Sequence, residues 1–251
     1  MSKSAFTKIF LGASPFFVVG AIWLVLTRNA FVKEIFLPSI PRVVQSLTYI
    51  FTQENYLLDV WVSTYRVMAA FILSAILAIP LGLFTGRFPK VAQLVEPFVG
   101  FVRYLPIPAF VPLCILWFGL GHEAKVAVIF LGTYFQLIIM IADISRNVQQ
   151  EYFEAAITLG ASQGQLFRQV LWPAALPGIV NACRTAVGWA WTYLVVAEIA
   201  GATSGIGFRI IEAQRFIQTP KVFAGIVVIG LLGLTTDLLF QAFYKYKFSW
   251  Q

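Results

Sequence analysis

Long apolar segments are the feature that most restricts how this chain can fold. Hydrophobic residues make up 59% of its 251 residues and charged residues 12%, whereas soluble domains average about 45–50% apolar and about 25% charged residues. A helix needs about 20 mostly apolar residues to cross a bilayer. Segments of this kind occupy residues 9–27, 60–86, 92–118, 124–145, 176–200 and 222–244. The sequence therefore predicts an all-α polytopic membrane protein with about six transmembrane helices.

The predicted spans and their short connections leave no room for a separate soluble domain. No small-residue cleavage site follows the first apolar run, so we expect this run to stay in the membrane. Residues 37–58 carry two early prolines and then apolar residues at helical spacing. This pattern predicts an amphipathic helix that lies at the external interface of the membrane. We expect residues 1–58 to form a transmembrane helix plus this interfacial helix, and residues 59–251 to form the core, with a loop at 146–176.

Lysines flank the first and last predicted spans. Lys3 and Lys8 precede the first span, and Lys245 and Lys247 follow the last. An even number of spans puts both termini on one side of the membrane, and the positive-inside rule predicts that this side is the cytoplasm. When all loop lysines and arginines are counted, eight fall on this side and seven on the other, so charge alone favours this orientation by a small margin.

Small residues recur at every fourth position in the second and fifth predicted spans. In lipid, such stripes allow two helix backbones to approach closely. They predict either packing within the chain, which is the commoner use, or an interface between subunits. The two stripes are Ala70, Ser74, Ala78, Gly82 and Gly86, and Gly178, Ala182, Ala186 and Ala190.

Prolines interrupt the third predicted span. Pro106, Pro108 and Pro112 each remove a backbone donor and clash with the preceding helical turn. The span is therefore predicted to be either kinked or broken, and a broken helix is tolerated at membrane depth where it lines a water-filled cavity. Arg103 stands just before the prolines. We expect Arg103, Pro106 and Pro108 to belong to a solute pathway or a gate.

Further ionisable side chains fall inside or beside the apolar segments. Each costs about 2.5–3.5 kcal/mol at the centre of a spanning helix, so such groups pair or face water. Arg184 and Glu198 lie about 21 Å apart along one predicted helix and must find partners on other helices. For Arg66 and Asp237 a structural role is favoured, as a snorkelling group or a buried pair. Arg184, Glu198 and the aromatic Trp191 are further candidates for the pathway or a gate.

Common catalytic and nucleotide-binding patterns are absent from the sequence. His122 is the only histidine, and the chain contains no HExxH, GxSxG or GxxxxGK[ST] pattern. We therefore predict no catalytic residue, metal site or cofactor in this chain, and no nucleic-acid partner. Any work driven by ATP must be done by another polypeptide.

The loop at 146–176 is mostly polar but has helical periodicity. Its pattern predicts two short helices joined at Gly160. Ala155 and Ala156 are small enough to let this loop seat closely in a groove of another protein, and Glu154 can cap a helix or pair with a basic group there. The loop is thus predicted to dock onto a partner.

The spacing of this loop resembles the EAA loop of ABC importer permeases. The family pattern is Glu-Ala-Ala, three residues, Gly, nine residues and then Ile-x-Leu-Pro. Glu154-Ala155-Ala156, Gly160 and Pro173 match it in register, while Val170 and Trp172 replace the isoleucine and leucine.

Several other motifs agree with the same family in order along the chain. Together they resemble the branch that transports nitrate, sulfonates, taurine and bicarbonate. They are Leu37-Pro38-Ser39-Ile40-Pro41, Ser63-Thr64-Tyr65-Arg66, Pro80-Leu81-Gly82, Pro112-Leu113, Trp117-Phe118-Gly119-Leu120-Gly121 and Ala197-Glu198.

The resemblance implies a type I ABC importer fold in the bacterial inner membrane, with a cytoplasmic coupling helix in the EAA loop and both termini in the cytoplasm. It implies a permease subunit for a small, anionic solute of the nitrate, bicarbonate, sulfonate or taurine class. The implied partners are a second copy of the chain, cytoplasmic ATPases that bind ATP and magnesium, and an external solute-binding protein. Glu154, Ala155, Ala156, Gly160 and Pro173 would then couple the chain to the ATPases. A stand-alone secondary transporter or channel, or a purely structural membrane subunit, are the alternatives.

Overall fold

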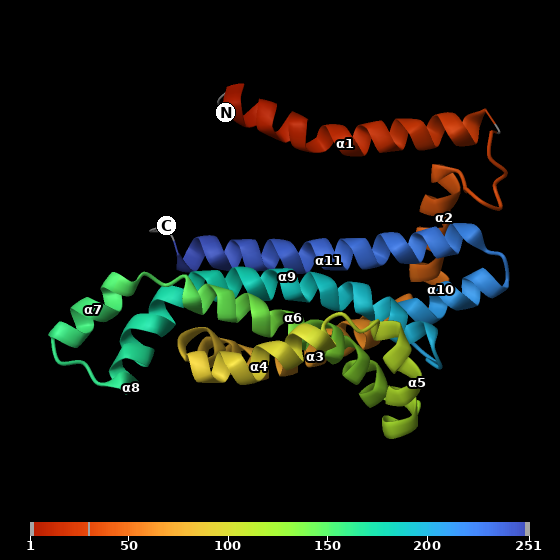
Figure 1. Cartoon of the computed structure of the whole chain (residues 1–251). Helices are drawn as coiled ribbons and strands as arrows, with labels where there is room; N and C mark the ends of the chain where they lie inside the picture. The colour runs from red at the N-terminus through yellow and green to blue at the C-terminus, as the bar shows by residue number, and fades with distance from the viewer. Residues whose placement is uncertain (1–2, 30, 249–251) are drawn as a thin grey trace. The chain divides into compact units, whose positions relative to one another are not determined.

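A computed structural model describes residues 3–29 and 31–248, which fold into helices joined by short connections (Figure 1). There is no β-strand among these residues. The elements are α1 Lys3–Arg28, α2 Ile40–Gln53, α3 Tyr56–Arg87, α4 Pro89–Val102, α5 Ile107–Phe118, α6 His122–Arg146, α7 Gln150–Thr158, α8 Gln163–Gln165, the π-helix η1 Leu166–Leu171, α9 Trp172–Ile199, α10 Ile206–Arg215 and α11 Thr219–Lys247.

Three helices of the described part, α3, α6 and α11, are long and apolar enough to cross a membrane. The bent pair of α4 and α5 makes a fourth if it is counted as one span. These helices cover the second, fourth and sixth predicted spans and, as the bent pair, the third. α1 has a shorter apolar stretch, Phe17–Arg28, and α9 carries Asn181 and Arg184 within its length. The number of six spans therefore stays a prediction.

The third predicted span is broken rather than merely kinked. α4 and α5 are bent by 96° where they meet. Pro106 occupies the N-cap of α5 and Pro108 lies in its first turn, where a residue without an N–H leaves no helical hydrogen bond unmade. The prolines therefore end one helix and start the next.

The chain divides into two compact units, Met1–Leu58 with Arg209–Val228, and Asp59–Phe208 with Ile229–Gln251. In the second unit α6 is the central helix, because it packs along α9 and also contacts α4 and α5 (Figure 1). The division into an N-terminal part and a core at residue 58 stays a prediction.

Both stripes of small residues pack against α6 within the chain. On α3, the Ser74 and Thr133 hydroxyls are hydrogen-bonded at 2.8 Å, and a Cβ at Gly82 would lie 2.6 Å from the Cβ of Ile141. On α9, a Cβ at Gly178 would lie 2.8 Å from Cγ2 of Ile144. The prediction of packing within the chain is confirmed, since a larger side chain at these positions would push the helices apart.

In the first unit, α2 is an amphipathic helix that is shorter than the predicted segment. Val43 and Ile50 are buried, whereas Val44 and Tyr49 are about half exposed. Past the helix, Glu54 accepts a hydrogen bond from Lys221 at 2.5 Å. The amphipathic pattern is confirmed, while the position of α2 at the membrane interface stays a prediction.

Candidate functional site

The loop between α6 and α9 has the helix–glycine–helix form that its sequence predicts. α7 ends at Thr158, and Gly160 adopts a left-handed φ of +83°, which favours glycine. Ser162 then starts α8 with a capping box, in which its backbone N–H donates to Gln165 at 2.8 Å. The second helix is not separate, however, because α8 continues through the π-helix η1 into α9. Pro173 cannot donate to the preceding turn, and a wider π turn at this point accommodates it.

One face of this loop is fixed to the last turns of α3. Phe153 is 2% exposed, and the guanidinium carbon of Arg87 lies 3.9 Å from the centre of its ring. The rings of Phe84 and Phe167 stack with their centres 5.0 Å apart. Aromatic and cation–π contacts of this kind hold α7 and η1 against α3.

The other face of the loop is exposed and partly apolar. Leu159 is 88% exposed and Ile157 is 53% exposed, and Glu154 and Ala155 are exposed beside them. Figure 1 shows α7 and α8 projecting beyond the ends of α6 and α9. A large apolar side chain that projects from a loop in this way is typical of a contact surface.

The break between α4 and α5 borders a cavity of about 360 Å³. α6 and α9 supply its other walls, and the lining contains aromatic side chains and one amide. The lining residues are Arg103, Leu105, Pro106, Ile107, Pro108, Leu131, Gly132, Phe135, Gln136, Trp189 and Tyr193. The structure thus places Arg103, Pro106 and Pro108 at one cavity, and their role in a solute pathway stays a prediction.

The electrostatic character of this cavity comes from Arg103. Among the described residues that line it, Arg103 is the only Asp, Glu, Lys or Arg. Its guanidinium is exposed and donates a hydrogen bond to the Tyr104 hydroxyl at 2.9 Å. A cavity with one cation, one amide and aromatic walls suits a small anion that also has an apolar part.

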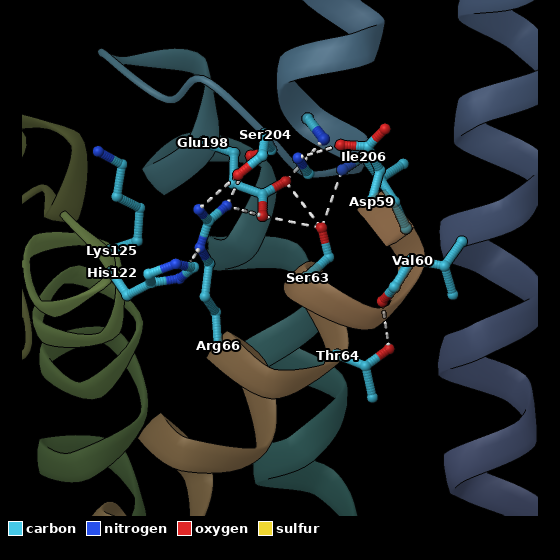
Figure 2. Close-up of polar contacts among 12 residues, drawn as sticks. Asp59, Val60, Ser63, Thr64, Arg66, His122, Lys125, Glu198, Ser204 and Ile206 are labelled. Atoms are coloured by element: carbon cyan, nitrogen blue, oxygen red, sulfur yellow. Dashed lines mark hydrogen bonds and ion pairs between the residues drawn. The ribbon is translucent and has the colours of Figure 1, made fainter. Parts of the chain in front are cut away.

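A buried polar network lies elsewhere in the same unit and is centred on Glu198 (Figure 2). This carboxylate is 1% exposed. It accepts hydrogen bonds from the Ser63 hydroxyl at 2.8 Å, from Arg66 Nη1 at 2.6 Å and from the backbone N–H of Gly207 at 2.7 Å. The expectation that Glu198 finds its partners on other elements is confirmed, and Arg66 is one half of a buried pair, as predicted.

The same network holds the start of α10. The backbone N–H of Gly205 donates to Asp59 at 2.7 Å, and that of Ile206 donates to the Ser63 hydroxyl at 2.9 Å. Arg66 also donates to the backbone carbonyl of Ser204 at 2.8 Å. The first N–H groups of a helix have no partner within the helix, and here side chains of α3 and α9 supply partners.

Only Glu198 of this network was predicted as a site residue, and two further ionisable side chains, His122 and Lys125, lie beside it. Arg66 donates to Nδ1 of His122 at 3.2 Å. Lys125 is 1% exposed, and its ammonium donates to the carbonyls of Leu120 at 2.7 Å and Gly201 at 3.1 Å. The available signal was the presence of the only histidine and of a lysine at the start of an apolar segment.

Arg184 and Trp191 connect α9 with α11 rather than joining the cavity. Arg184 forms a bidentate ion pair with Asp237, in which Nε donates to Oδ1 and Nη2 donates to Oδ2 at 3.0 Å. The indole N–H of Trp191 donates to the Thr236 hydroxyl at 3.2 Å. The predicted pathway residues therefore occupy three places: the cavity, the α9–α11 contact and the network around Glu198.

Known proteins resemble this chain over most of its length. Residues 78–246 match the family model described as "Binding-protein-dependent transport system inner membrane component". A Brucella abortus (strain 2308) protein named "Probable ABC transporter permease protein" is 33% identical over 229 residues, which cover 91% of this chain and 90% of that protein. The taurine transport system permease protein TauC of Escherichia coli (strain K12) is 29% identical over 248 residues, which cover 97% and 90%.

The fold has a counterpart among solved structures. A chain of the methionine ABC transporter MetNI, in an inward-facing conformation, superposes with a TM-score of 0.66 at 21% identity, covering 76% of this chain and 94% of that chain. At this identity the likeness concerns the fold.

Proposed function

The chain belongs to the family of binding-protein-dependent transport system inner membrane components, and from that premise we propose that it lines the path of a small anion through an ATP-driven importer. As a member of this family it is a transport subunit of an ABC importer and not an enzyme, and ATP hydrolysis takes place on a separate subunit. An ATPase and a solute-binding protein are its family partners. ATP and magnesium are bound by the ATPase.

The observation that carries this proposal is the projecting loop of α7 and α8. Its inner face is fixed to α3 through Phe153, and its outer face exposes Ile157 and Leu159 beside the small residue Ala155. An apolar outer face on a rigidly mounted loop supports docking of this loop into a groove of the ATPase. Motion of the ATPase would then pass through Phe153 and Phe167 to α3.

Alternating access describes how this motion moves a solute. Two copies of the chain form the permease, with both termini and the α7–α8 loop in the cytoplasm. Closure of the ATPases brings the two loops together and opens the path outward, and ATP hydrolysis resets it. A ligand such as ATP shifts this equilibrium only through its different affinity for the two states.

A single substitution at the loop tip tests the docking step. Leu159→Glu places a charge on a side chain that is 88% exposed, so folding should be unaffected while apolar contact with the ATPase is lost. We expect the ATPase to stop co-purifying with this variant, whereas the control Leu159→Met should retain it. Unchanged co-purification of the Glu variant would show that the outer face of the loop is not the docking surface.

The solute is a small anion, and the sulfonate class is favoured. Arg103 gives the cavity its charge, and Trp189 and Tyr193 give it aromatic walls. A sulfonate combines three acceptor oxygens with an apolar chain, which matches a guanidinium beside aromatic rings. The relative TauC is named for taurine transport, and taurine carries a sulfonate group.

Calorimetry on the cognate solute-binding protein tests the class of solute. We expect it to bind small solutes that carry an anionic group, such as taurine, other sulfonates, nitrate or bicarbonate. Affinity only for solutes without an anionic group would contradict this proposal and leave the permease assignment in place.

A further inference from the structure

Two glycine-containing loops lie at one end of the second unit. One follows α5 at residues 119–121, and the other follows α9 at residues 200–205. Gly119, Gly201 and Gly205 have φ values of +74°, +68° and +110°, a region that side-chain-bearing residues rarely adopt. Loops of this composition are free to move unless other groups fix them.

Lys125 joins these two loops directly. Its ammonium donates to the carbonyl of Leu120 in one loop at 2.7 Å and to the carbonyl of Gly201 in the other at 3.1 Å. The loops are also in contact, because a Cβ at Gly201 would lie 2.7 Å from Cδ2 of Leu120. A buried ammonium is costly without hydrogen-bond partners, so separating the loops would leave Lys125 without one of these carbonyls.

The network around Glu198 fixes the second loop to the helices beneath it. Arg66 on α3 holds the carbonyl of Ser204, and Asp59 on α3 holds the N–H of Gly205. Figure 2 shows Lys125 on the side of the cluster where His122 and Arg66 also lie. The loop after α9 is therefore anchored, and Lys125 extends this anchoring to the loop after α5.

The two helices that precede these loops, α5 and α9, form two walls of the cavity. α5 supplies Ile107 and Pro108, and α9 supplies Trp189 and Tyr193. If the ends of α5 and α9 moved independently, these walls would shift past each other during a conformational change. A link between the loops keeps the walls in register.

We propose that Lys125 is a positioning residue for solute transport, whose ammonium makes the loop after α5 and the loop after α9 move as one body. Lys125 does not touch the cavity and acts through the two loops. The transport role rests on the proposed function, whereas the joint movement of the loops is a property of the chain that is measured separately.

Cross-linking measures the joint movement without any solute. Cys114 and Cys183, which are buried and unpaired, are first replaced by alanine, and Leu120→Cys and Ala202→Cys then place one thiol in each loop. A short bis-methanethiosulfonate reagent is applied to the complex with its ATPase, both free of nucleotide and trapped with ATP and vanadate. We expect equal cross-linking in both states with Lys125 present, and state-dependent cross-linking in Lys125→Met. Cross-linking that changes between the states with Lys125 present would overturn the proposal.

Uptake of radiolabelled taurine into proteoliposomes, with ATPase and binding protein present, tests the positioning role. We expect Lys125→Met to lower the uptake rate about tenfold, since it removes two hydrogen bonds of a buried cation. Lys247→Met, at an exposed position on α11, is the matched control and should not change uptake. Linking the two loops covalently should restore uptake to the Lys125→Met protein.

The outcomes separate the two proposals. The positioning role would be overturned if the covalent link did not restore uptake to a folded Lys125→Met protein. It would also be overturned if uptake were lost when the link is made with Lys125 present. If Lys125→Met does not fold, the linked protein that retains Lys125 still decides the question. Absence of ATP-dependent taurine uptake in the unsubstituted protein would count against the sulfonate class of solute in the proposed function, while the cross-linking result would stand.

Discussion

The stability of the network around Glu198 depends on the negative charge of this buried carboxylate. Its two oxygens accept hydrogen bonds from Ser63, Arg66 and the N–H of Gly207. A glutamine has the same shape but would turn an N–H₂ group toward one of these donors. A buried donor facing another donor loses the hydrogen bond and also leaves Arg66 without a counter-charge.

We therefore expect Glu198→Gln to lower the free energy of unfolding by about 3–5 kcal/mol, the range for breaking a buried ion pair from one side. The matched control is Glu34→Gln, which breaks the pair with Arg42, whose side chains are 51% and 57% exposed. The control should cost less than about 1 kcal/mol, because solvent screens an exposed pair. Thermal unfolding of the purified variants in detergent compares the two, and equal losses would contradict this description of Glu198.

At the residue scale, the sequence predicted that the buried charged side chains have partners on other helices, but it did not identify those partners. The apolar surroundings of Arg184 and Glu198 indicated that each pairs with another helix. The identities of the partners were out of reach because Arg66 and Glu198 are 132 positions apart, and which turns of two helices meet depends on the packing of all side chains between them. Lys125 was missed because its ammonium is satisfied by backbone carbonyls, which no sequence motif records.

At the scale of elements, regular patterns were predicted well and departures from regularity less well. Long apolar segments, the amphipathic pattern of α2 and the glycine after α7 all correspond to helices or their ends. The prolines indicated a disturbance between α4 and α5 but left a kink and a break equally open, since the choice depends on what the broken ends pack against. The continuous path from α8 through η1 into α9 was not predicted, because a π turn has no sequence pattern of its own.

Two glycines on neighbouring helices should respond oppositely to alanine. At Gly82 on α3, a Cβ would lie 2.6 Å from the Cβ of Ile141 and 2.9 Å from the carbonyl oxygen of Ile138. The backbone cannot move aside, so we expect Gly82→Ala to cost about 1–3 kcal/mol through overpacking. At Gly188 on α9, a Cβ would meet no atom within 4 Å, and Gly188→Ala should stabilise the helix by up to about 1 kcal/mol.

Unfolding temperatures of both variants, measured side by side, check this pair of expectations. A stabilising Gly82→Ala would show that α3 and α6 are not in close backbone contact at this position.

At the scale of the whole molecule, the sequence was most informative about the class of protein and least informative about the transported solute. The EAA-like spacing and the absence of a phosphate-binding loop together pointed to a transport subunit that needs an ATPase on a separate polypeptide, and the family match agrees with this. The solute is harder to predict, because the residues that line the cavity come from the connection between α4 and α5 and from α5, α6 and α9, and no one of these segments forms a binding motif alone. Of the cavity residues, Arg103, Pro106 and Pro108 were foreseen through the broken helix, whereas Gln136 was not.

The most direct test of the central claim is ATP-dependent uptake in proteoliposomes. The purified chain is reconstituted either alone or with its ATPase and solute-binding protein, and entry of radiolabelled taurine is followed with and without ATP on the ATPase side. We expect uptake only when both partners and ATP are present, and none from the chain alone under a proton or sodium gradient. Gradient-driven uptake by the chain alone would contradict the assignment and identify a secondary transporter.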